Sequence, residues 1–481
     1  MKMIINGKRV DAASGETVEV LNPATGEVLD TVPVATQADI EAALDAARQG
    51  QKVWAKVPIY ERIAILKRFR ALLERDALAV STMLTRELGK PLTQSTSETA
   101  CTLNIIDNFC ECARTLGGET YVPNNFSHST GGDLVMTVRE PIGVVACILP
   151  FNYPIELFVQ KVVPALLMGN AVVIKPATDT PLANIRMAEL LLEAGVAPEA
   201  VQLVTGSGAR IGKWLCESPK IDCISLTGST AVGIETARNA AAHLHEVGLE
   251  LGGNDPLIIF DDCDLDQAVA EAVGGRFANS GQTCCASKRF IVQNSIKEAF
   301  TEKLVQAVSQ LVVGDPFDEK TSYGPMVNPR ALQDVMAQIK LTVEQGAKLL
   351  CGGEVVNNGV SVAPTVLGDV TREMSIANEM EIFGPVWPVI GFDTEEEAVE
   401  LANHTPYGLS SGIITKDIFR ALRMARQIDA GGVVLNGAGL YRTPEQPFGG
   451  YKSTGIGQEG GAHTLLSMSL NKTLILKGAF S

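Results

Sequence analysis

The sequence predicts an α/β protein in which doubly wound parallel sheets carry the functional site. In the middle of the chain, near-continuous apolar segments such as GVVACILP and AVVIKP alternate with amphipathic segments of helical length. Apolar strands that alternate with helices are typical of a parallel sheet covered on both faces. Ligands of such sheets bind beyond the carboxyl ends of the strands. The predicted strand ends carry Asn152, Lys175, Gly206 and Gly228.

The first part of the chain predicts short strands followed by helices. Turn-forming pairs, NG at 6–7 and NP at 22–23, interrupt the apolar segments that precede the first helix. Thr36, followed three residues later by Asp39, is typical of a helix start with a reciprocal capping pair. Amphipathic periodicity predicts three further helices, the middle one closed by Gly89, over 59–75, 77–88 and 93–115.

A second α/β block begins near Glu250, where the strands PLIIF and RFIV enclose a predicted helix over 264–279. Further strands and helices run to about residue 435. Two strand-like segments belong to neither block: DLVMTV (133–138) and LLSMSLNKTLIL (465–476). We expect each of them to pair with another segment or with another subunit.

Composition limits the class of protein. The 481 residues are 46% hydrophobic and 20% charged, which is typical of a soluble globular chain of two or three domains. The net charge of −15 would repel the backbone of a nucleic acid. No apolar run reaches the roughly 20 residues of a membrane span, and the start MKMIINGKRV lacks the apolar core of a signal peptide. We therefore expect a cytoplasmic protein that binds neither nucleic acid nor membrane.

The 10 cysteines and 5 histidines do not form the pattern of a metal site. Cytoplasmic thiols are mostly reduced, and most of these should be buried apolar side chains. Cys110 and Cys112 are too close for a zinc CxxC pair, and no matching pair follows. We expect no structural metal.

Two glycine-containing turns follow strands and precede helices, as phosphate-binding loops do. TGSGARIG (205–212) has two glycines of a dinucleotide fingerprint, but the third comes one residue late, so an ordinary turn is equally consistent. In TGSTAVG (227–233), backbone N–H groups and the Ser229 hydroxyl suit a pyrophosphate, although serine is also a common N-cap. Two such turns on successive strands favour a nucleotide.

Two charged residues at strand ends have both a functional and a structural interpretation. Lys175 could be a solvated charge, or it could bind a ribose hydroxyl or a phosphate. Asp179, the nearest acid that could bind a ribose diol, already lies close to the next helix. Glu250, in GLELGGND, could be a general base whose pKa burial raises, or half of an ion pair between domains.

The segment NSGQTCCASKRF (279–290) places Cys284 beside Cys285. A free cysteine is most often a core residue, and a catalytic one needs surroundings that favour the thiolate. Neighbouring residues on an extended segment point in opposite directions, so we expect at most one of the two to face a cleft. Composition alone does not decide which one.

Several motifs, in the same order and spacing, resemble the aldehyde dehydrogenase superfamily and span most of the chain. They are LPFNYP (149–154), VVIKP (172–176), TGSTAVG (227–233), LELGGNDP (249–256), NSGQTCCA (279–286), EIFGPV (381–386) and PFGGYKSTGIGQEG (447–460). Leu226 stands where Phe is commoner, and Met380 replaces an acid. Thr178, three residues after Lys175, stands where NAD-preferring members often carry Glu.

The resemblance implies an NAD(P)-dependent enzyme that oxidises an aldehyde to the acid. Its nucleophile falls on Cys284, with Cys285 as packing or as a neighbour able to form a protective bond on oxidation. The Asn152 amide and the backbone N–H of Cys284 stabilise the oxyanion. Hydride passes to the nicotinamide, and Glu250 activates the water that hydrolyses the thioester.

The resemblance also implies sites for the cofactor, NADP or NAD, and for a small-molecule aldehyde. Lys175 contacts the adenine-side ribose, Glu381 holds the nicotinamide ribose, and Phe383 packs near the ring. The residues assigned to the cofactor are Pro150, Phe151, Lys175, Thr178, Gly208, Gly228, Ser229, Thr230, Gly233, Leu251, Glu381 and Phe383. Those assigned to the substrate are Tyr153, Glu156, Gln160, Arg442 and Phe448.

The implied architecture is aldehyde dehydrogenase-like: two doubly wound Rossmann-type α/β domains with a β oligomerisation arm, in a homodimer or homotetramer. The implied ranges are 1–116 and 141–248 for the cofactor-binding domain, 249–435 for the catalytic domain, 117–140 and 461–481 for the arm, and 436–460 for a returning segment that lines the substrate tunnel.

Cofactor and substrate preferences follow from a few positions. Thr178 predicts that NADP is accepted at least as well as NAD, because an acid there would repel the 2′-phosphate.

The substrate preference follows from the predicted helix after Asn152. Glu156 and Gln160 lie on the same face of this helix as Asn152, and a negative Glu156 disfavours anionic aldehydes. Several semialdehyde dehydrogenases carry arginine where this chain has Gln160. We expect a small uncharged hydroxyaldehyde such as lactaldehyde or glycolaldehyde. Arg442 could instead grip an anion, which leaves succinate semialdehyde as the alternative.

Two other classes are less consistent with these residues. CoA-acylating relatives usually lack the glutamate found here as Glu250. A non-catalytic relative would be expected to have lost Cys284 or Glu250, and both are present.

Overall fold

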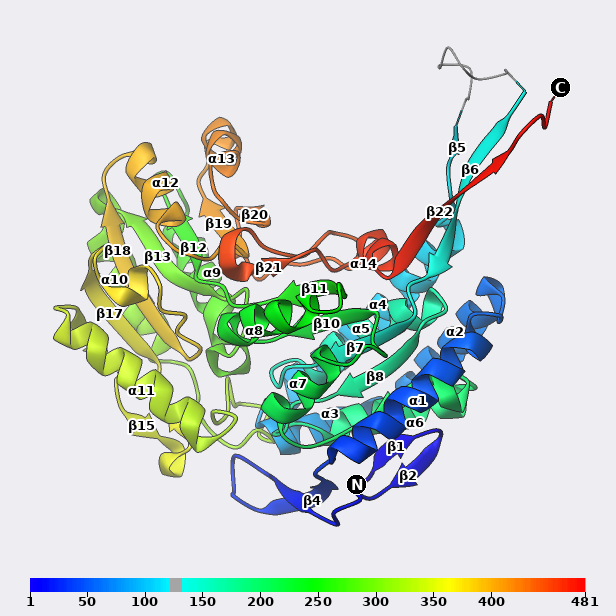
Figure 1. The fold of residues 1–481 in the computed structure, drawn as a ribbon. Helices are drawn as coiled ribbons and strands as arrows, with labels where there is room; N and C mark the ends of the chain where they lie inside the picture. The colour runs from blue at the N-terminus through cyan, green and yellow to red at the C-terminus, as the bar shows by residue number, and fades with distance from the viewer. Residues whose placement is uncertain (122–131, 481) are drawn as a thin grey trace.

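The computed structural model describes residues 1–121 and 132–480. These residues form two large β-sheets flanked by helices, and a small sheet that projects away from the body (Figure 1). Residues 122–131 and 481, which include part of the predicted arm, lie outside the described residues. None of the described helices is long and apolar enough to cross a membrane.

The first large sheet has the order β2-β1-β9-β8-β7-β10-β11-β21. Strands β7 to β11 are parallel, as predicted, but β1 and β21 pair antiparallel with them, so the sheet is mixed at its edges. The strands are β1 Met3–Ile5, β2 Lys8–Val10, β7 Val144–Ile148, β8 Ala171–Lys175, β9 Val201–Leu203, β10 Cys223–Thr227, β11 Glu246–Glu250 and β21 Gly455–Ile456. A separate hairpin consists of β3 Thr17–Leu21 and β4 Val28–Pro33.

Helices α5 and α6 pack against this sheet and are covered in turn by α2, α3 and α4, while α1, α7 and α8 also contact its strands. The predicted capping pair of Thr36 and Asp39 is present at the start of α1, and Gly89 ends α3 with φ 78°. The helices are α1 Gln37–Trp54, α2 Ile59–Arg75, α3 Ala77–Leu88, α4 Leu92–Thr115, α5 Pro154–Leu167, α6 Leu182–Ala194, α7 Gly208–Cys216 and α8 Thr230–Ala241.

The second large sheet has the order β14-β17-β18-β13-β12-β19-β20 and is parallel except for β14. Its strands are β12 Asp255–Ile259, β13 Ser287–Gln293, β14 Lys348–Cys351, β17 Thr365–Val370, β18 Val386–Phe392, β19 Ser410–Ile414 and β20 Gly432–Leu435. The helices of this half are α9 Leu265–Phe277, α10 Asn294–Val308, α11 Pro329–Glu344, α12 Glu395–Asn403 and α13 Ile418–Ala425.

The two strand-like segments without a place in either sheet are partners of each other. β6 (Leu134–Pro141) pairs antiparallel with β22 (Ser469–Leu476), and β5 (Thr120–Tyr121) adds a third strand (Figure 1). The predicted strand over 465–476 is wrong in its first part, because α14 (Gly461–Ser467) extends into it. Leu465 and Met468, three residues apart, are buried on one face, so helical periodicity prevails there.

Candidate active site

Two cavities meet near the carboxyl ends of the strands of the first sheet. The first cavity, of about 310 Å³, lies between α4, the start of α5, the turn before β13 and the returning segment. The second cavity, of about 530 Å³, lies over the ends of β7, β8 and β10 and the first turns of α7 and α8. The residues that border both cavities are Asn152, Thr227, Leu251 and Cys284. Molecules bound in the two cavities would therefore meet at these residues.

A turn with left-handed residues precedes the two cysteines, of which Cys284 lies at this junction. Asn279 and Ser280 adopt left-handed φ values of 51° and 59°, which ends the helical run two residues before the predicted boundary of 279. The side chain of Asn279 donates to the carbonyls of Asn152 and Gln282, at 3.0 and 3.3 Å. A polar side chain that bonds local carbonyls is the usual compensation for such a backbone.

Cys284 and Cys285 both border the first cavity, so the expectation that at most one would face a cleft is wrong. The chain forms a turn at these residues and is not extended. A hydrogen bond between the two thiols, together with burial, raises the pKa of Cys284 above its ordinary value, and the same bond lowers the pKa of Cys285. Only Cys284 also borders the second cavity.

Lys288 is a buried cation close to this pair. Its ammonium donates to the carbonyl of Cys284 and lies 3.6 Å from the carboxylate of Glu381. Its charge opposes the rise in the pKa of Cys284. The sequence did not single out Lys288, because a lysine at the start of a strand gives no indication of burial.

Glu250 is the last residue of β11 and borders the first cavity. Burial, followed by repulsion from Glu459, raises its pKa well above the ordinary value, while Lys161 and Arg442 oppose this rise. Within the described residues Glu250 has no ion-pair partner, so the alternative of an ion pair between domains is not supported. A raised pKa makes the ionised carboxylate a stronger proton acceptor, which suits a general base.

Asn152 lies between β7 and α5, and it is 4% exposed. Its side-chain Oδ1 is buried and has no hydrogen-bond partner among the described residues. Buried polar atoms normally have a partner, so this unpartnered acceptor at the cavity junction indicates a place for a ligand or water that donates to it. Its backbone carbonyl, in contrast, accepts from both Lys90 and Asn279.

Most residues assigned to the cofactor border the second cavity: Pro150, Phe151, Lys175, Gly208, Gly228, Ser229, Leu251, Glu381 and Phe383. The exceptions are Thr178, Thr230 and Gly233. Thr178 donates to the Gly206 carbonyl at 3.1 Å and borders another cavity, while Thr230 donates to the Ser453 carbonyl at 3.4 Å. A Cβ at Gly233 would come within 2.4 Å of Leu251, so this glycine permits packing of α8.

The second cavity has the chemistry that a dinucleotide requires. The first turns of α7 and α8 border it, and the Ser229 hydroxyl is not used to cap α8. Burial lowers the pKa of Lys175 to about 8, so it is largely charged at neutral pH. Glu381 accepts from the backbone N–H of Gly253 at 3.0 Å. Lys213 and Glu235, which the sequence did not single out, also border this cavity.

All residues assigned to the aldehyde border the first cavity: Tyr153, Glu156, Gln160, Arg442 and Phe448. The Arg442 guanidinium lies 4.0 Å from both the Glu156 carboxylate and the centre of the Phe448 ring. Its Nη2, like both amide atoms of Gln160, is buried without a partner in the described part of the chain. Burial raises the pKa of Glu156.

The sequence missed two buried ion pairs beside the first cavity. Lys161 on α5 pairs with Glu459 of the returning segment, and Lys90 pairs with Glu98 on α4. Glu98 falls on the buried face of α4. A charged residue at an apolar helical position was the only available indication, because its partner lies on a different element.

The model of the aldehyde dehydrogenase family matches residues 10–474. The chain belongs to the aldehyde dehydrogenase family. The match extends over the second large sheet, the returning segment and all but the N-terminal edge strands of the first sheet, and it confirms the resemblance drawn from the motifs. The protein is therefore an NAD(P)-dependent aldehyde dehydrogenase with Rossmann-type α/β architecture.

Solved structures similar to this aldehyde dehydrogenase cover nearly the whole chain. An aldehyde dehydrogenase from Brucella melitensis biovar abortus 2308 is 36% identical with a TM-score of 0.95, over 99% of this chain and 97% of that one. An E. coli NADP dependent enzyme is 34% identical with a TM-score of 0.95, over 99% and 98%. Betaine aldehyde dehydrogenase from Staphylococcus aureus, in complex with NAD⁺, is 33% identical with a TM-score of 0.95, over 99% and 95%.

Proposed function

We propose that this enzyme oxidises a small, polar, uncharged aldehyde to the carboxylic acid, with Cys284 as the nucleophile. The observation that carries the proposal is that Cys284 borders both cavities, whereas Cys285 borders only the first. Asn152 shares the junction, and Glu250 borders the first cavity. Absorbance at 340 nm with a panel of aldehydes tests the activity, and it should rise without added CoA. An absolute requirement for CoA would favour the acylating alternative.

Catalysis begins when the Cys284 thiolate attacks the aldehyde carbon. The Sγ–C bond forms and the carbonyl oxygen becomes an oxyanion, which accepts hydrogen bonds from the Asn152 side-chain amide and the backbone N–H of Cys284. The oxyanion then re-forms the C=O bond as the C–H bond breaks, which leaves a thioester on Cys284; a nicotinamide bound in the second cavity would supply the hydride acceptor. Glu250 then removes a proton from a water molecule that adds to the thioester carbon. The C–Sγ bond breaks, and the acid and the Cys284 thiolate are released.

The proposal assigns a role to each part of the fold. The cofactor-binding domain is 1–116 with 141–248, and the catalytic domain is 249–435. Residues 436–460 return along the substrate tunnel and add β21 to the first sheet. The arm, 117–140 with 461–481, would join subunits into a homodimer or homotetramer. Its edge strand β22 exposes Leu474, Ile475 and Leu476, as expected of a strand that meets a second copy.

We also propose that NADP is accepted at least as well as NAD. Lys175 and Lys213 border the second cavity, and position 178 carries no acid. Because the Thr178 hydroxyl is bonded to Gly206, its contribution is the absence of a negative charge and not a new contact. A like-charge contact at a binding site costs several kcal/mol.

Thr178→Glu should lower kcat/KM for NADP by at least about tenfold, or roughly 1.4 kcal/mol, relative to NAD. Thr178→Gln, which has the same size without the charge, is the matched control and should keep the wild-type ratio. Steady-state kinetics with both cofactors measure the effect. Wild-type enzyme without NADP-linked activity would contradict the proposal.

The first cavity favours an uncharged, hydroxylated substrate. Its unpartnered polar atoms include a donor and an acceptor on Gln160 and an acceptor on Glu459. A hydroxyl group can both donate and accept, so it would satisfy such a set. Arg442 lies close to both Glu156 and Phe448, which supports a bracing role, and its unpartnered Nη2 is a further donor that a substrate hydroxyl can meet.

Lactaldehyde or glycolaldehyde should therefore have a higher kcat/KM than succinate semialdehyde. Glu156→Gln removes the negative charge that repels an anionic substrate. It should therefore raise kcat/KM for succinate semialdehyde and reduce the difference between this aldehyde and the uncharged ones. Parallel kinetics with the three aldehydes measure both effects. A wild-type preference of about 100-fold for succinate semialdehyde, roughly 2.7 kcal/mol, would show that Arg442 outweighs Glu156 and that the alternative substrate is correct.

A further inference from the structure

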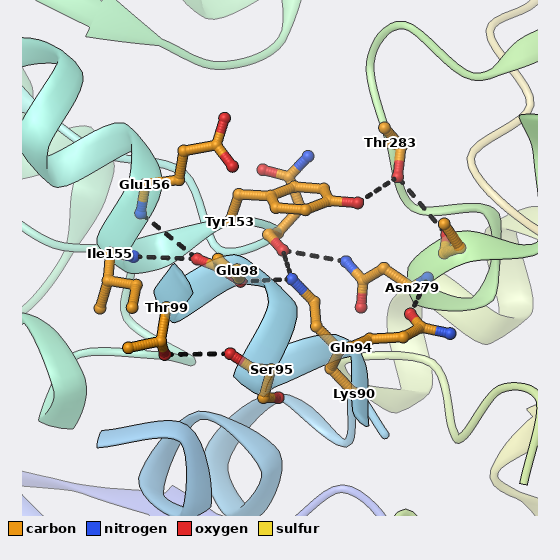
Figure 2. A network of polar contacts seen from close by, with 12 residues as sticks. Lys90, Gln94, Ser95, Glu98, Thr99, Tyr153, Ile155, Glu156, Asn279 and Thr283 are labelled. Atoms are coloured by element: carbon orange, nitrogen blue, oxygen red, sulfur yellow. Dashed lines mark hydrogen bonds and ion pairs between the residues drawn. The ribbon is translucent and has the colours of Figure 1, made fainter. Parts of the chain in front are cut away.

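Lys90 and Glu98 form a fully buried ion pair beside the first cavity, with Nζ and Oε2 2.6 Å apart. Lys90 lies between α3 and α4, and Glu98 lies two turns into α4. Figure 2 shows Lys90 between Glu98 and Asn279, close to the Tyr153 ring, whose centre is 3.7 Å from the ammonium. Replacing a buried ion pair by apolar residues is often neutral or stabilising, so fold stability alone does not account for this one.

Both members of the pair also bond the backbone around Asn152. Lys90 donates to the Asn152 carbonyl at 2.9 Å, and Asn279 donates to the same oxygen at 3.0 Å. The Oε1 atom of Glu98 accepts from the backbone N–H groups of Ile155 and Glu156, at 3.2 and 3.3 Å. The carboxylate thus caps the first turn of α5 from a neighbouring helix.

These bonds fix the main chain on both sides of the Asn152 side chain and leave that side chain uncommitted. The carbonyl of Asn152 has two donors, the start of α5 is tied to Glu98, and Oδ1 remains without a partner within the described residues. A shift of about 1 Å in a group that stabilises a transition state can reduce the rate roughly a hundredfold.

We propose that Lys90 and Glu98 are a positioning pair, which holds the Asn152 amide where it meets the developing oxyanion beside Cys284. The inference rests on the proposed function, because it assumes the oxyanion role of Asn152. Neither residue donates to the substrate in this account; they act through the main chain of Asn152.

A double-mutant cycle tests the proposal. Lys90→Met, Asn152→Ala and the double variant are compared by the single-turnover rate of NAD(P)H formation at saturating aldehyde. Lys90→Met should slow this step about a hundredfold with little change in aldehyde KM. The double variant should be no slower than Asn152→Ala, because the group that Lys90 positions is already absent.

The outcomes separate this inference from the proposed function. If the rate decreases of Lys90→Met and Asn152→Ala multiply in the double variant, the pair does not act through Asn152. The same conclusion follows if Lys90→Met raises the aldehyde KM and leaves the single-turnover rate unchanged. Either result overturns only this inference. If Asn152→Ala is as fast as wild type, the oxyanion assignment itself is wrong, and this inference is overturned with it.

If Lys90→Met folds poorly, a second variant with a matched control still tests the proposal. Glu98→Gln keeps the shape of the side chain and removes its charge. Glu87 is the control for loss of a buried cap, because its carboxyl group, whose pKa burial raises to about 8, caps α6 by accepting from the backbone N–H groups of Leu182 and Ala183 at 2.7 and 3.0 Å. Glu98→Gln should slow single turnover at least tenfold, whereas Glu87→Gln should keep the wild-type rate for a comparable change in Tm. Equal rates in the two variants would overturn the proposal.

Discussion

Cys284→Ala should abolish dehydrogenase activity and any esterase activity. The thiolate is the only group in the proposed mechanism that forms a bond to the aldehyde carbon. Deleting a covalent nucleophile costs at least about ten-thousandfold in kcat. Initial rates at 340 nm and hydrolysis of a chromogenic ester measure both activities in the same preparation.

Cys285→Ala is the matched control, since it removes an adjacent thiol of the same cavity. It should keep most of both activities, because Cys285 does not border the second cavity. The variant also breaks the hydrogen bond that raises the pKa of Cys284, so thiolate formation at Cys284 should become easier. A dead Cys285 variant beside an active Cys284 variant would reverse the assignment.

Glu250→Gln should release about one reduced cofactor per active site in a burst and then turn over slowly. The amide keeps the size of the side chain but cannot accept a proton from water, so acylation proceeds and hydrolysis stalls. Stopped-flow absorbance at 340 nm separates the two phases. Steady-state turnover at the wild-type rate would exclude Glu250 as the base.

The pH dependence of the wild-type enzyme also tests whether Glu250 is the general base. Burial and Glu459 raise the pKa of Glu250, and the base must be deprotonated to act. The rate of the deacylation phase should therefore fall as the pH decreases through this raised pKa. In Glu250→Gln the rate of the slow deacylation phase should no longer fall as the pH decreases.

Much of the fold followed from local patterns. The capping pair of Thr36 and Asp39, the αL glycine at Gly89 and the periodicity of α2 and α3 each report on neighbouring residues, and the structure confirms them. The parallel strands around β7 and β8 were predicted from their apolar runs, for the same reason. The end of α14 was missed because Leu466 and Met468 flank Ser467, and this spacing also fits the strand that follows.

The candidate site was predictable only where a motif described it. The positions of Cys284, Glu250 and Asn152 came from the family resemblance, and the structure brings all three to the first cavity. The turn at Cys284 and the ion pair of Lys90 with Glu98 depend on contacts between distant elements. Such contacts leave no periodic pattern in the sequence.

The sequence also predicts cofactor specificity only in part. The absence of an acid at Thr178 could be read from the sequence, but the bond of its hydroxyl to Gly206 could not. The same holds for Lys213, which is charged at an unremarkable helical position and borders the second cavity only because α7 begins at the end of β9.

The most direct test of the account is to trap the acyl-enzyme. Glu250→Gln, incubated with lactaldehyde and NADP and quenched in acid, is digested at low pH and its peptides are weighed by mass spectrometry. The account predicts a thioester adduct on Cys284 in the peptide that contains both cysteines, and none when Cys284→Ala is added. An adduct on Cys285, or reduced cofactor without any adduct, would contradict it.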